Sequence, residues 1–334
     1  MKKTKQNILV TGSAGFIGFH LVSKLINKNK NIINIDNLNN YYDVKLKKKR
    51  LKKLNAICKL KKAKFIFYKV DISNKKKLLN IFKKYKISKV VHLAAQAGVR
   101  YSFKKPQLYV DTNLIGFFNI LEACRLNNIK NLIYASSSSV YGDSKNFPFK
   151  ENKMSNAPLQ FYAATKICNE VMAHSYSKLY KINVTGLRFF TVYGPNGRPD
   201  MAYYSFTKKI LENKKILVFN HGNHHRDLTY IDDIVRGILL VIFKKQVKLY
   251  QTFNIGNGKP IKLMSLINYL EKFLNKKAKI TFLNKQKGDM DKTFASINLF
   301  KKNYGYKPRV KPRVGLNKFV AWYLNYYKKN EKIN

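Results

Sequence analysis

Two residues four positions apart are the first candidates for chemistry, namely Tyr162 and Lys166 in the segment Tyr162-Ala-Ala-Thr-Lys166. On a helix, positions i and i+4 share one face, so the phenol and the ammonium would lie side by side. A neighbouring cation favours the phenolate and lowers the pKa of tyrosine from about 10 toward the working pH. Such a tyrosine can take a proton from a hydroxyl while hydride leaves the same carbon. An exposed helix pair would look the same, so the interpretation depends on the neighbouring motifs.

A cluster of hydroxyl groups is the second candidate. Four consecutive serines follow an apolar run in Ala135-Ser-Ser-Ser-Ser-Val-Tyr141. If residues 131–137 form a buried strand of a parallel sheet, these serines lie at its carboxyl end, where such sheets bind ligands. The alternative is a serine-rich turn without a ligand.

A glycine-rich segment indicates how a cofactor would be held. The apolar run 8–11 leads into Gly12-Ser-Ala-Gly15-Phe-Ile-Gly18 and then into a helical pattern. Glycines there permit a tight turn, let backbone approach a pyrophosphate, and let the helix start face the phosphates. Asp36 ends the next apolar run, and a carboxylate at that place accepts hydrogen bonds from the adenosine ribose and repels a 2′-phosphate. The motif therefore predicts a dinucleotide site that favours NAD over NADP.

The elements that position these motifs alternate between strand and helix. Apolar runs at 8–11, 32–36, 64–70, 89–93, 131–137 and 183–189 predict buried strands, and residues 16–27, 75–85, 107–126 and 161–180 predict helices. Such alternation predicts an α/β fold with a Rossmann-type, doubly wound parallel sheet. Beyond residue 190, helices at 201–213, 230–243, 264–273 and 315–327 with short strands between them indicate a smaller α/β substrate-binding lobe.

Composition limits the alternatives. The net charge is +49, but 57 of the 66 cations are lysine and they are spread over the whole chain. A nucleic-acid surface favours arginine, so we interpret the charge as compositional drift and expect no nucleic-acid partner, although a functional basic surface stays open. Three scattered cysteines predict neither disulfides nor zinc, and so no metal site. The basic start, residues 1–6, lacks a following signal-like apolar region, and no segment could span a membrane, so a cytoplasmic enzyme is expected.

Together these motifs resemble the extended short-chain dehydrogenase/reductase family, also called NAD-dependent epimerases/dehydratases, over nearly the whole chain. The resemblance also rests on Asp71-Ile72, on His92-Leu-Ala-Ala95 and on Asn113. It implies that Ser137 assists Tyr162 in catalysis, that Lys166 binds the nicotinamide ribose, and that Asp71 and Ile72 frame the adenine. The residues implied to bind NAD are Gly12, Ala14, Gly15, Phe16, Ile17, Gly18, Asp36, Asn37, Asp71, Ile72, Leu93, Ala94, Ala95, Gln96, Asn113, Tyr162 and Lys166.

Within that family, three segments are most similar to UDP-glucuronate 4-epimerases: residues 36–44, 92–102 and 188–202. The resemblance implies that Thr191 and the serines hold a substrate carboxylate, that Arg198 and Arg226 serve the diphosphate or carboxylate, and that Asp289 reaches the uridine ribose. The expected substrate-binding residues are Arg100, Ser137, Ser138, Ser139, Thr191, Arg198, Arg226 and Asp289. Two departures from the family pattern are Gln286, which puts one phosphate contact in doubt, and Asn196-Gly197, where bulkier residues are frequent.

The family also interleaves its lobes. An NAD-binding domain is therefore expected at 1–190 plus about 230–256, and a UDP-sugar-binding lobe at 191–229 plus 257–334. A homodimer through 107–126 and 161–180 is likewise implied. Of the nine arginines, Arg100, Arg188, Arg198, Arg226 and Arg236 lie in or near the similar segments, which suggests a geometric need for arginine there.

The resemblance implies C4 epimerisation of UDP-glucuronate to UDP-galacturonate through a transient 4-keto intermediate, with tightly bound NAD. A ketone at C4 beside a carboxylate on C5 is a β-keto acid, which loses CO₂ easily, so fixing the carboxylate would favour epimerisation. Three alternatives stay open: a 4-epimerase of UDP-glucose or UDP-N-acetylglucosamine, a UDP-glucuronate decarboxylase, and a non-catalytic basic binding scaffold.

Overall fold

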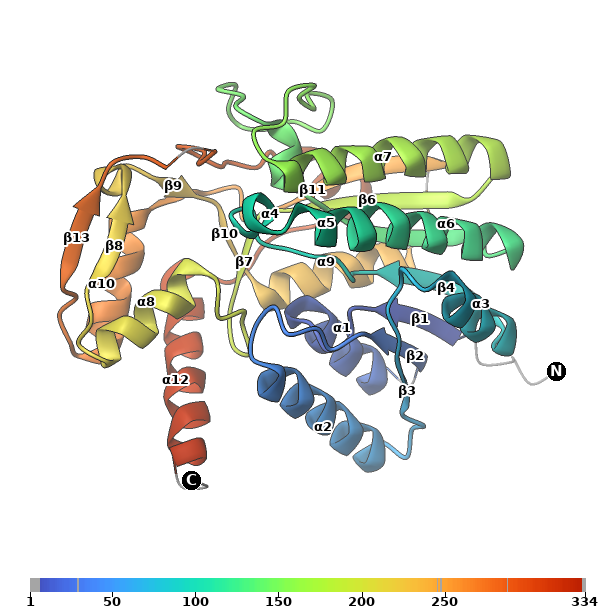
Figure 1. The fold of residues 1–334 in the computed structure, drawn as a ribbon, viewed down its shortest axis with the longest axis horizontal. Coiled ribbons are helices and arrows are strands. Elements are labelled where there is room, and N and C mark those ends of the chain that lie inside the picture. The colour runs from blue at the N-terminus through green and yellow to red at the C-terminus, as the bar shows by residue number, and fades with distance from the viewer. Residues whose placement is uncertain (1–6, 29, 245, 247, 287, 332–334) are drawn as a thin grey trace.

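The computed structural model describes residues 7–28, 30–244, 246, 248–286 and 288–331 (Figure 1). Residues 1–6, which include the basic start, and residues 332–334 fall within the domains predicted from the sequence but lie outside the described residues. Among the described residues, no helix is long and apolar enough to cross a membrane.

A seven-stranded parallel sheet forms the larger lobe and confirms the predicted fold class. Its order is β11-β6-β5-β4-β1-β2-β3. The chain therefore adds β2 and β3 on one side of β1, then crosses over and adds β4, β5, β6 and β11 on the other side. The strands are β1 (Asn7–Thr11), β2 (Asn31–Asp36), β3 (Ile66–Lys69), β4 (Ile87–His92), β5 (Asn131–Ser137), β6 (Asn183–Phe189) and β11 (Tyr250–Ile255). β11 comes late in the sequence and pairs with β6 from Tyr250 opposite Val184 to Ile255 opposite Phe189.

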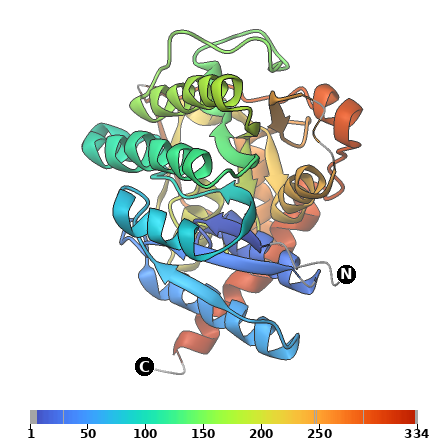
Figure 2. The same ribbon diagram turned by 90° about the vertical axis from the view of Figure 1, so that its right-hand side faces the viewer.

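Helices cover both faces of this sheet because alternate strand residues point in opposite directions. Ile8 and Val10 of β1 pack with α1 (Phe16–Asn27), α2 (Val44–Leu60) and α9 (Ile231–Phe243). Leu9, between them, packs on the other face with α3 (Lys75–Lys84), α6 (Gly116–Leu126) and α7 (Phe161–Tyr180). The end-on view shows the two layers, with the green helices on one side of the sheet and the blue α2 on the other (Figure 2).

The smaller lobe lies beyond the carboxyl ends of the strands and is built from short strand pairs and helices (Figure 1). Three two-stranded sheets pair β10 with β7, β12 with β9, and β13 with β8. Its elements are β7 (Thr191–Tyr193), α8 (Ala202–Leu211), β8 (Ile216–Phe219), β9 (His225–Arg226), β10 (Leu228–Tyr230), β12 (Ile261–Lys262), α10 (Leu263–Leu274), β13 (Ile280–Leu283) and α12 (Pro312–Glu331). The short helix α11 (Asn298–Tyr304) packs instead against β11 of the larger lobe.

Several elements differ from the sequence-based expectation: the short helix α11 was not predicted, and two further differences lie beside the cavities. The helix α2 was not predicted, because lysines fill most of its surface, yet Leu46, Arg50, Leu54 and Cys58 form a buried stripe at four-residue spacing. The helix predicted at 107–126 is interrupted: α5 (Pro106–Tyr109) leads into a π-helical segment, Val110–Ile115, and then into α6. Such π-helical turns are frequent at functional sites, and this one carries Asn113.

His92, the last residue of β4, gives the fold a pH-dependent stability. Its ring is buried, its Nδ1 lies 2.8 Å from Thr11 Oγ1, and burial lowers its pKa to about 3. The unfolded chain binds this proton below pH 6.5, whereas the folded chain resists it until about pH 3. Stability is therefore lost as the pH falls through that window.

We expect the free energy of unfolding to fall by about 2 kcal/mol between pH 7 and pH 5 on account of His92 alone. Urea titrations of the wild-type protein and of His92→Gln at both pH values measure this, and the variant should lose that part of the pH dependence. His221→Gln, in an exposed turn, is the control. An unchanged pH dependence in His92→Gln would contradict this account.

Candidate active site

The glycine-rich turn between β1 and α1 is shaped by backbone contacts that leave no room for side chains. Gly12 has φ +72°, and a Cβ on it would lie 2.7 Å from Ala94 N. A Cβ on Gly18 would overlap the carbonyl oxygen of Gly12. The turn is closed by Gly15 N donating to Gly12 O at 3.0 Å. The glycines are therefore required for the close approach of α1 to the sheet.

The start of α1 fits a dinucleotide phosphate. No side chain caps this helix among the described residues, and Gly15 to Gly18 line a cavity. Ser13 Oγ is buried nearby and has no hydrogen-bond partner in the part of the chain that the structure describes. Free N–H groups at a helix start bind anions, so this donor set matches a pyrophosphate.

Asp36 lines the same cavity beside the glycine-rich turn, at the carboxyl end of β2. Its carboxylate accepts hydrogen bonds from Ala14 N at 3.0 Å and from Leu38 N at 2.8 Å. Burial raises the pKa of Asp36, while these two bonds and the nearby Lys47 oppose the shift. The position suits the predicted contact with ribose hydroxyls.

Of the predicted cofactor residues, fourteen line this cavity: Gly12, Gly15, Phe16, Ile17, Gly18, Asp36, Asn37, Ile72, Leu93, Ala94, Ala95, Gln96, Tyr162 and Lys166. Ala14, Asp71 and Asn113 lie behind it instead. Asp71 accepts from Asn37 Nδ2 at 2.8 Å. Asn113 exchanges two hydrogen bonds with the backbone of Gln96 and donates a third to Thr165, so it ties the β4 loop to α7.

The tyrosine and lysine of α7 come together at the cavity floor. The Lys166 ammonium is 5.9 Å from the centre of the Tyr162 ring and donates to Ala135 O at 2.9 Å. Burial lowers the pKa of Lys166 to about 8, opposed by Glu170. Burial raises the pKa of Tyr162, opposed by a hydrogen bond with Ser137 and by the charge of Arg198. In the chain by itself the pKa of Tyr162 is therefore raised and not lowered as expected, because desolvation outweighs the hydrogen bond with Ser137 and the charge of Arg198.

A second cavity of about 770 Å³ opens toward the smaller lobe, a volume typical of small-molecule sites. It is lined by all eight of the predicted substrate residues: Arg100, Ser137, Ser138, Ser139, Thr191, Arg198, Arg226 and Asp289. The two cavities share five polar side chains in their walls, those of Tyr41, Ser137, Tyr162, Thr191 and Arg198. The predicted acid–base residues therefore lie where the two cavities meet.

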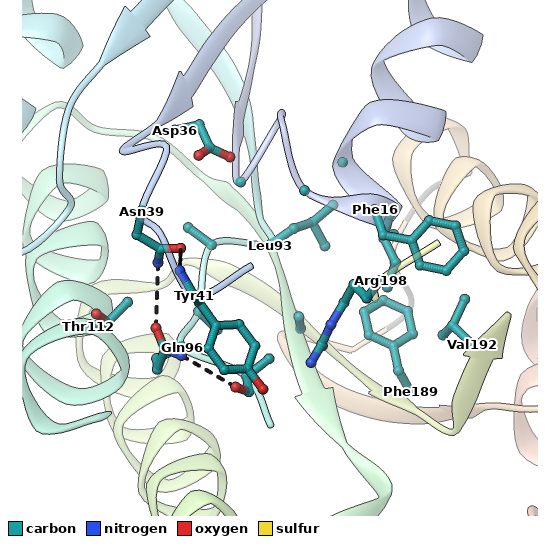
Figure 3. Close-up of a pocket in the computed structure, with 18 of the residues that line it drawn as sticks. Phe16, Asp36, Asn39, Tyr41, Leu93, Gln96, Thr112, Phe189, Val192 and Arg198 are labelled. Atoms are coloured by element: carbon teal, nitrogen blue, oxygen red, sulfur yellow. Dashed lines mark hydrogen bonds between the residues drawn. The ribbon is translucent and has the colours of Figure 1, made fainter. Parts of the chain in front are cut away.

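Two arginines in this second cavity are already paired with carboxylates, whereas Arg226 donates to the backbone carbonyls of His225 and Asp291. Arg198 donates from Nε and Nη2 to the carboxylate of Asp200, and Tyr41 Oη donates to the same carboxylate at 3.1 Å. Arg100 forms an ion pair with Asp289 at 2.9 Å. Figure 3 shows Tyr41 and Arg198 projecting toward one another across the first cavity.

Several lining residues were not predicted. Asn39 and Lys47 line the first cavity and Tyr41 lines both, and all three follow β2. Lys47 donates to Asn39 O at 2.7 Å, and burial lowers its pKa to about 8 (Figure 3 shows Asn39). In the sequence, the segment 36–44 is marked only by its similarity to the family. No periodic pattern around it predicts that these side chains face a cavity.

The five arginines in or near the segments similar to the family do not all line the two cavities. Arg188 is buried and forms a two-pronged pair with Glu170, at 2.9 and 2.7 Å. Arg236 pairs with the buried Asp233 of α9. For these two residues the geometric need for arginine is structural, since each guanidinium pairs with a buried carboxylate.

The glycine turn, the Asp36 carboxylate and the Tyr162/Lys166 pair on a seven-stranded parallel sheet define a nicotinamide-dependent short-chain dehydrogenase/reductase. The chain matches the NAD dependent epimerase/dehydratase family over residues 8–256 and belongs to it.

Three similar proteins indicate which members of the family the chain resembles. Protein CapI of Staphylococcus aureus is 46% identical over 96% of this chain and 99% of its own length. UDP-glucuronate 4-epimerase 4 of Arabidopsis thaliana is 42% identical over 97% of this chain and 77% of its own. The crystal structure of UDP-glucuronic acid 4-epimerase from Bacillus cereus, in complex with UDP-glucuronic acid and NAD, is 35% identical. It has a TM-score of 0.87 and covers 96% of this chain and all of its own.

The Asp36 geometry makes a prediction about cofactor choice. Asp36→Asn removes the charge that strengthens hydrogen bonds to ribose, so we expect NAD to bind about tenfold more weakly or worse. The preference for NAD over NADP should shrink as well, because the repulsion of a 2′-phosphate is lost. Calorimetric titration with both cofactors measures this, with the exposed Asp232→Asn on α9 as the control. Unchanged affinities would place the ribose elsewhere.

Proposed function

We propose that the protein is an NAD-dependent UDP-glucuronate 4-epimerase that interconverts UDP-glucuronate and UDP-galacturonate. The observation that carries the proposal is the junction of the two cavities, where Tyr162 is flanked by the hydroxyls of Ser137 and Thr191 and by Arg198. A neutral hexose needs no cation beside the reacting carbon, whereas a uronate carboxylate is matched by arginine and hydroxyl donors.

The chemistry is a reversible oxidation at C4. Tyr162 Oη takes the proton of the C4 hydroxyl, and Ser137 holds the same oxygen. NAD, when bound, accepts the hydride from C4 and supplies it for the return step. Lys166 binds the nicotinamide ribose, and its ammonium stabilises the phenolate, a contribution that the buried site makes necessary because burial raises the pKa of Tyr162. The ketone then presents its other face within the cavity.

The carboxylate needs restraint while C4 is a ketone. Ser137 to Ser139, Thr191 and Arg198 line one wall of the second cavity and offer the donors that would hold it. Holding the carboxylate out of alignment with the ketone π-system disfavours loss of CO₂. These residues therefore serve to prevent decarboxylation as well as to bind the substrate carboxylate. Arg226, Asp289 and Arg100, farther along the same cavity, are proposed to hold the UDP.

The Rossmann domain is proposed to comprise 1–190 plus about 230–256, with the remainder as the UDP-sugar lobe. A cytoplasmic location is also proposed. Its support is the cysteines: Cys58 and Cys124 are buried as free thiols and Cys168 is exposed and unpaired, which suits a reducing compartment.

A product assay tests the function. Purified protein, with UDP-glucuronate and no added NAD, should form UDP-galacturonate as followed by NMR. Tyr162→Phe should slow this by about 10²–10⁴-fold, the usual contribution of a general acid–base group, and Tyr180→Phe at the far end of α7 should not. Turnover of UDP-glucose alone would show a neutral-sugar epimerase, and a pentose product would show a decarboxylase.

We also propose a homodimer through α6 and α7, which lie side by side on one face of the sheet (Figure 1). Both helices present apolar side chains to solvent, and the most exposed are Leu126, Val171 and Leu179. Burying such side chains against a second copy is favourable at about 25 cal/mol per Å².

Light scattering after size exclusion should give twice the chain mass of 38.9 kDa. Val171→Glu should shift the protein to monomer, because it buries a charge in the interface. Leu60→Glu is the control, since Leu60 is also an exposed apolar residue but lies at the end of α2 across the molecule. A dimer that survives Val171→Glu would place the interface elsewhere.

A further inference from the structure

The turn just before Arg198 is held by side chains from the other lobe. Three successive carbonyls, those of Pro195, Asn196 and Gly197, accept hydrogen bonds from the helices beside the phosphate loop. His20 Nε2 of α1 lies 2.8 Å from Pro195 O. Arg50 Nη2 of α2 donates to Asn196 O at 2.8 Å and to Gly197 O at 3.0 Å. The segment Asn196-Gly197, which departs from the family pattern, is therefore a place where the two lobes are joined by hydrogen bonds.

Arg50 also reaches back to the cofactor loop. Its Nη1 donates to Ala14 O at 2.8 Å, within the glycine-rich turn, and to Tyr42 Oη at 2.7 Å. The side chain is completely buried. One guanidinium thus connects the loop that binds the cofactor phosphates with the turn that carries Arg198.

Such a residue is costly to bury. Among the described residues, the partners of Arg50 are carbonyl and hydroxyl oxygens and not a carboxylate, and its Nε has no partner. Burying a charge costs free energy. The nearby carboxylate of Asp36 attracts the guanidinium but forms no hydrogen bond with it among the described residues. Lysine could not replace it, because one ammonium cannot span four oxygens on two sides as a planar fork does. Local rules are broken in this way mostly at functional sites.

The turn itself has little freedom once its carbonyls are held. Asn196 has φ +55°, and a Cβ on Gly197 would overlap the hydroxyl of Tyr203. Fixing the carbonyls of Asn196 and Gly197 therefore fixes where the next residue, Arg198, leaves the backbone.

We infer that Arg50 is a positioning residue that sets Arg198 at the reacting carbon by tying its turn to the cofactor loop. The inference rests on the proposed function only for what Arg198 contacts. Arg50 acts at a distance, since it lines neither cavity.

A double-mutant cycle tests this on the NAD-loaded enzyme. Arg50→Met is expected to lower kcat/KM for UDP-glucuronate by about 100-fold, the usual effect of a small misplacement, and to raise the decarboxylated fraction of product. In an Arg198→Met background the same change should cost less than about threefold, because the residue it positions is gone. Arg50→Lys should stay within about threefold of Arg50→Met. Equal losses in both backgrounds, or full rescue by lysine, would overturn the inference.

Hydrogen exchange of peptides covering 194–203 gives a readout that needs no substrate. Arg50→Met, or Arg50→Lys if the first variant does not fold, should exchange faster there than the wild type. Arg236→Met is the control. It removes a guanidinium of α9 that is bound to Asp233 and to Lys307 O, and it should leave exchange in residues 194–203 unchanged. Unchanged exchange in the Arg50 variant would overturn the inference even if the enzyme epimerises UDP-glucuronate. If the wild type leaves UDP-glucuronate unchanged, the proposed function fails, and the exchange result alone decides the role of Arg50.

Discussion

The close approach of α1 to the carboxyl end of β1 is the constraint on which the rest of the structure depends. The contacts that exclude a side chain at Gly12 and Gly18 are both with backbone atoms, so no repacking of neighbours could relieve them. They place the start of α1 at the edge of the sheet where β2, β4 and β5 also end. Asp36, the β4 loop and the serines meet there as a consequence of parallel pairing.

Burial at this edge sets the electrostatics of the site. Desolvation moves the pKa of Tyr162 up and that of Lys166 down to about 8, so in the chain alone both groups are driven toward their neutral forms. In the proposed mechanism, proton removal by Tyr162 depends on positive charge around it. Arg198 of the smaller lobe opposes the rise in the pKa of Tyr162, so in that mechanism the lobe would contribute to acid–base chemistry as well as to binding.

Much of the sheet, the glycine turn and Asp36 could be predicted from local patterns in the sequence, because buried parallel strands and glycine turns leave strong ones. Most other residues that line the first cavity were expected only from the family resemblance. α1 and α7 were predicted to the residue. The lysine-rich α2 was not, since its apolar stripe is thin and includes Arg50. Tyr41 and Asp200 were missed for another reason: their meeting joins positions far apart in the chain, and neither lies on a periodic element. The same limit hid the bridge that Arg50 makes between the two lobes.

The central claim is an internal oxidation and reduction at C4 of a UDP-uronic acid, and an isotope label tests it most directly. UDP-glucuronate carrying deuterium at C4 should give UDP-galacturonate that retains the deuterium at C4 when the reaction is run in ordinary water and followed by NMR. Loss of that deuterium to solvent, or incorporation of solvent hydrogen at C5, would contradict the account.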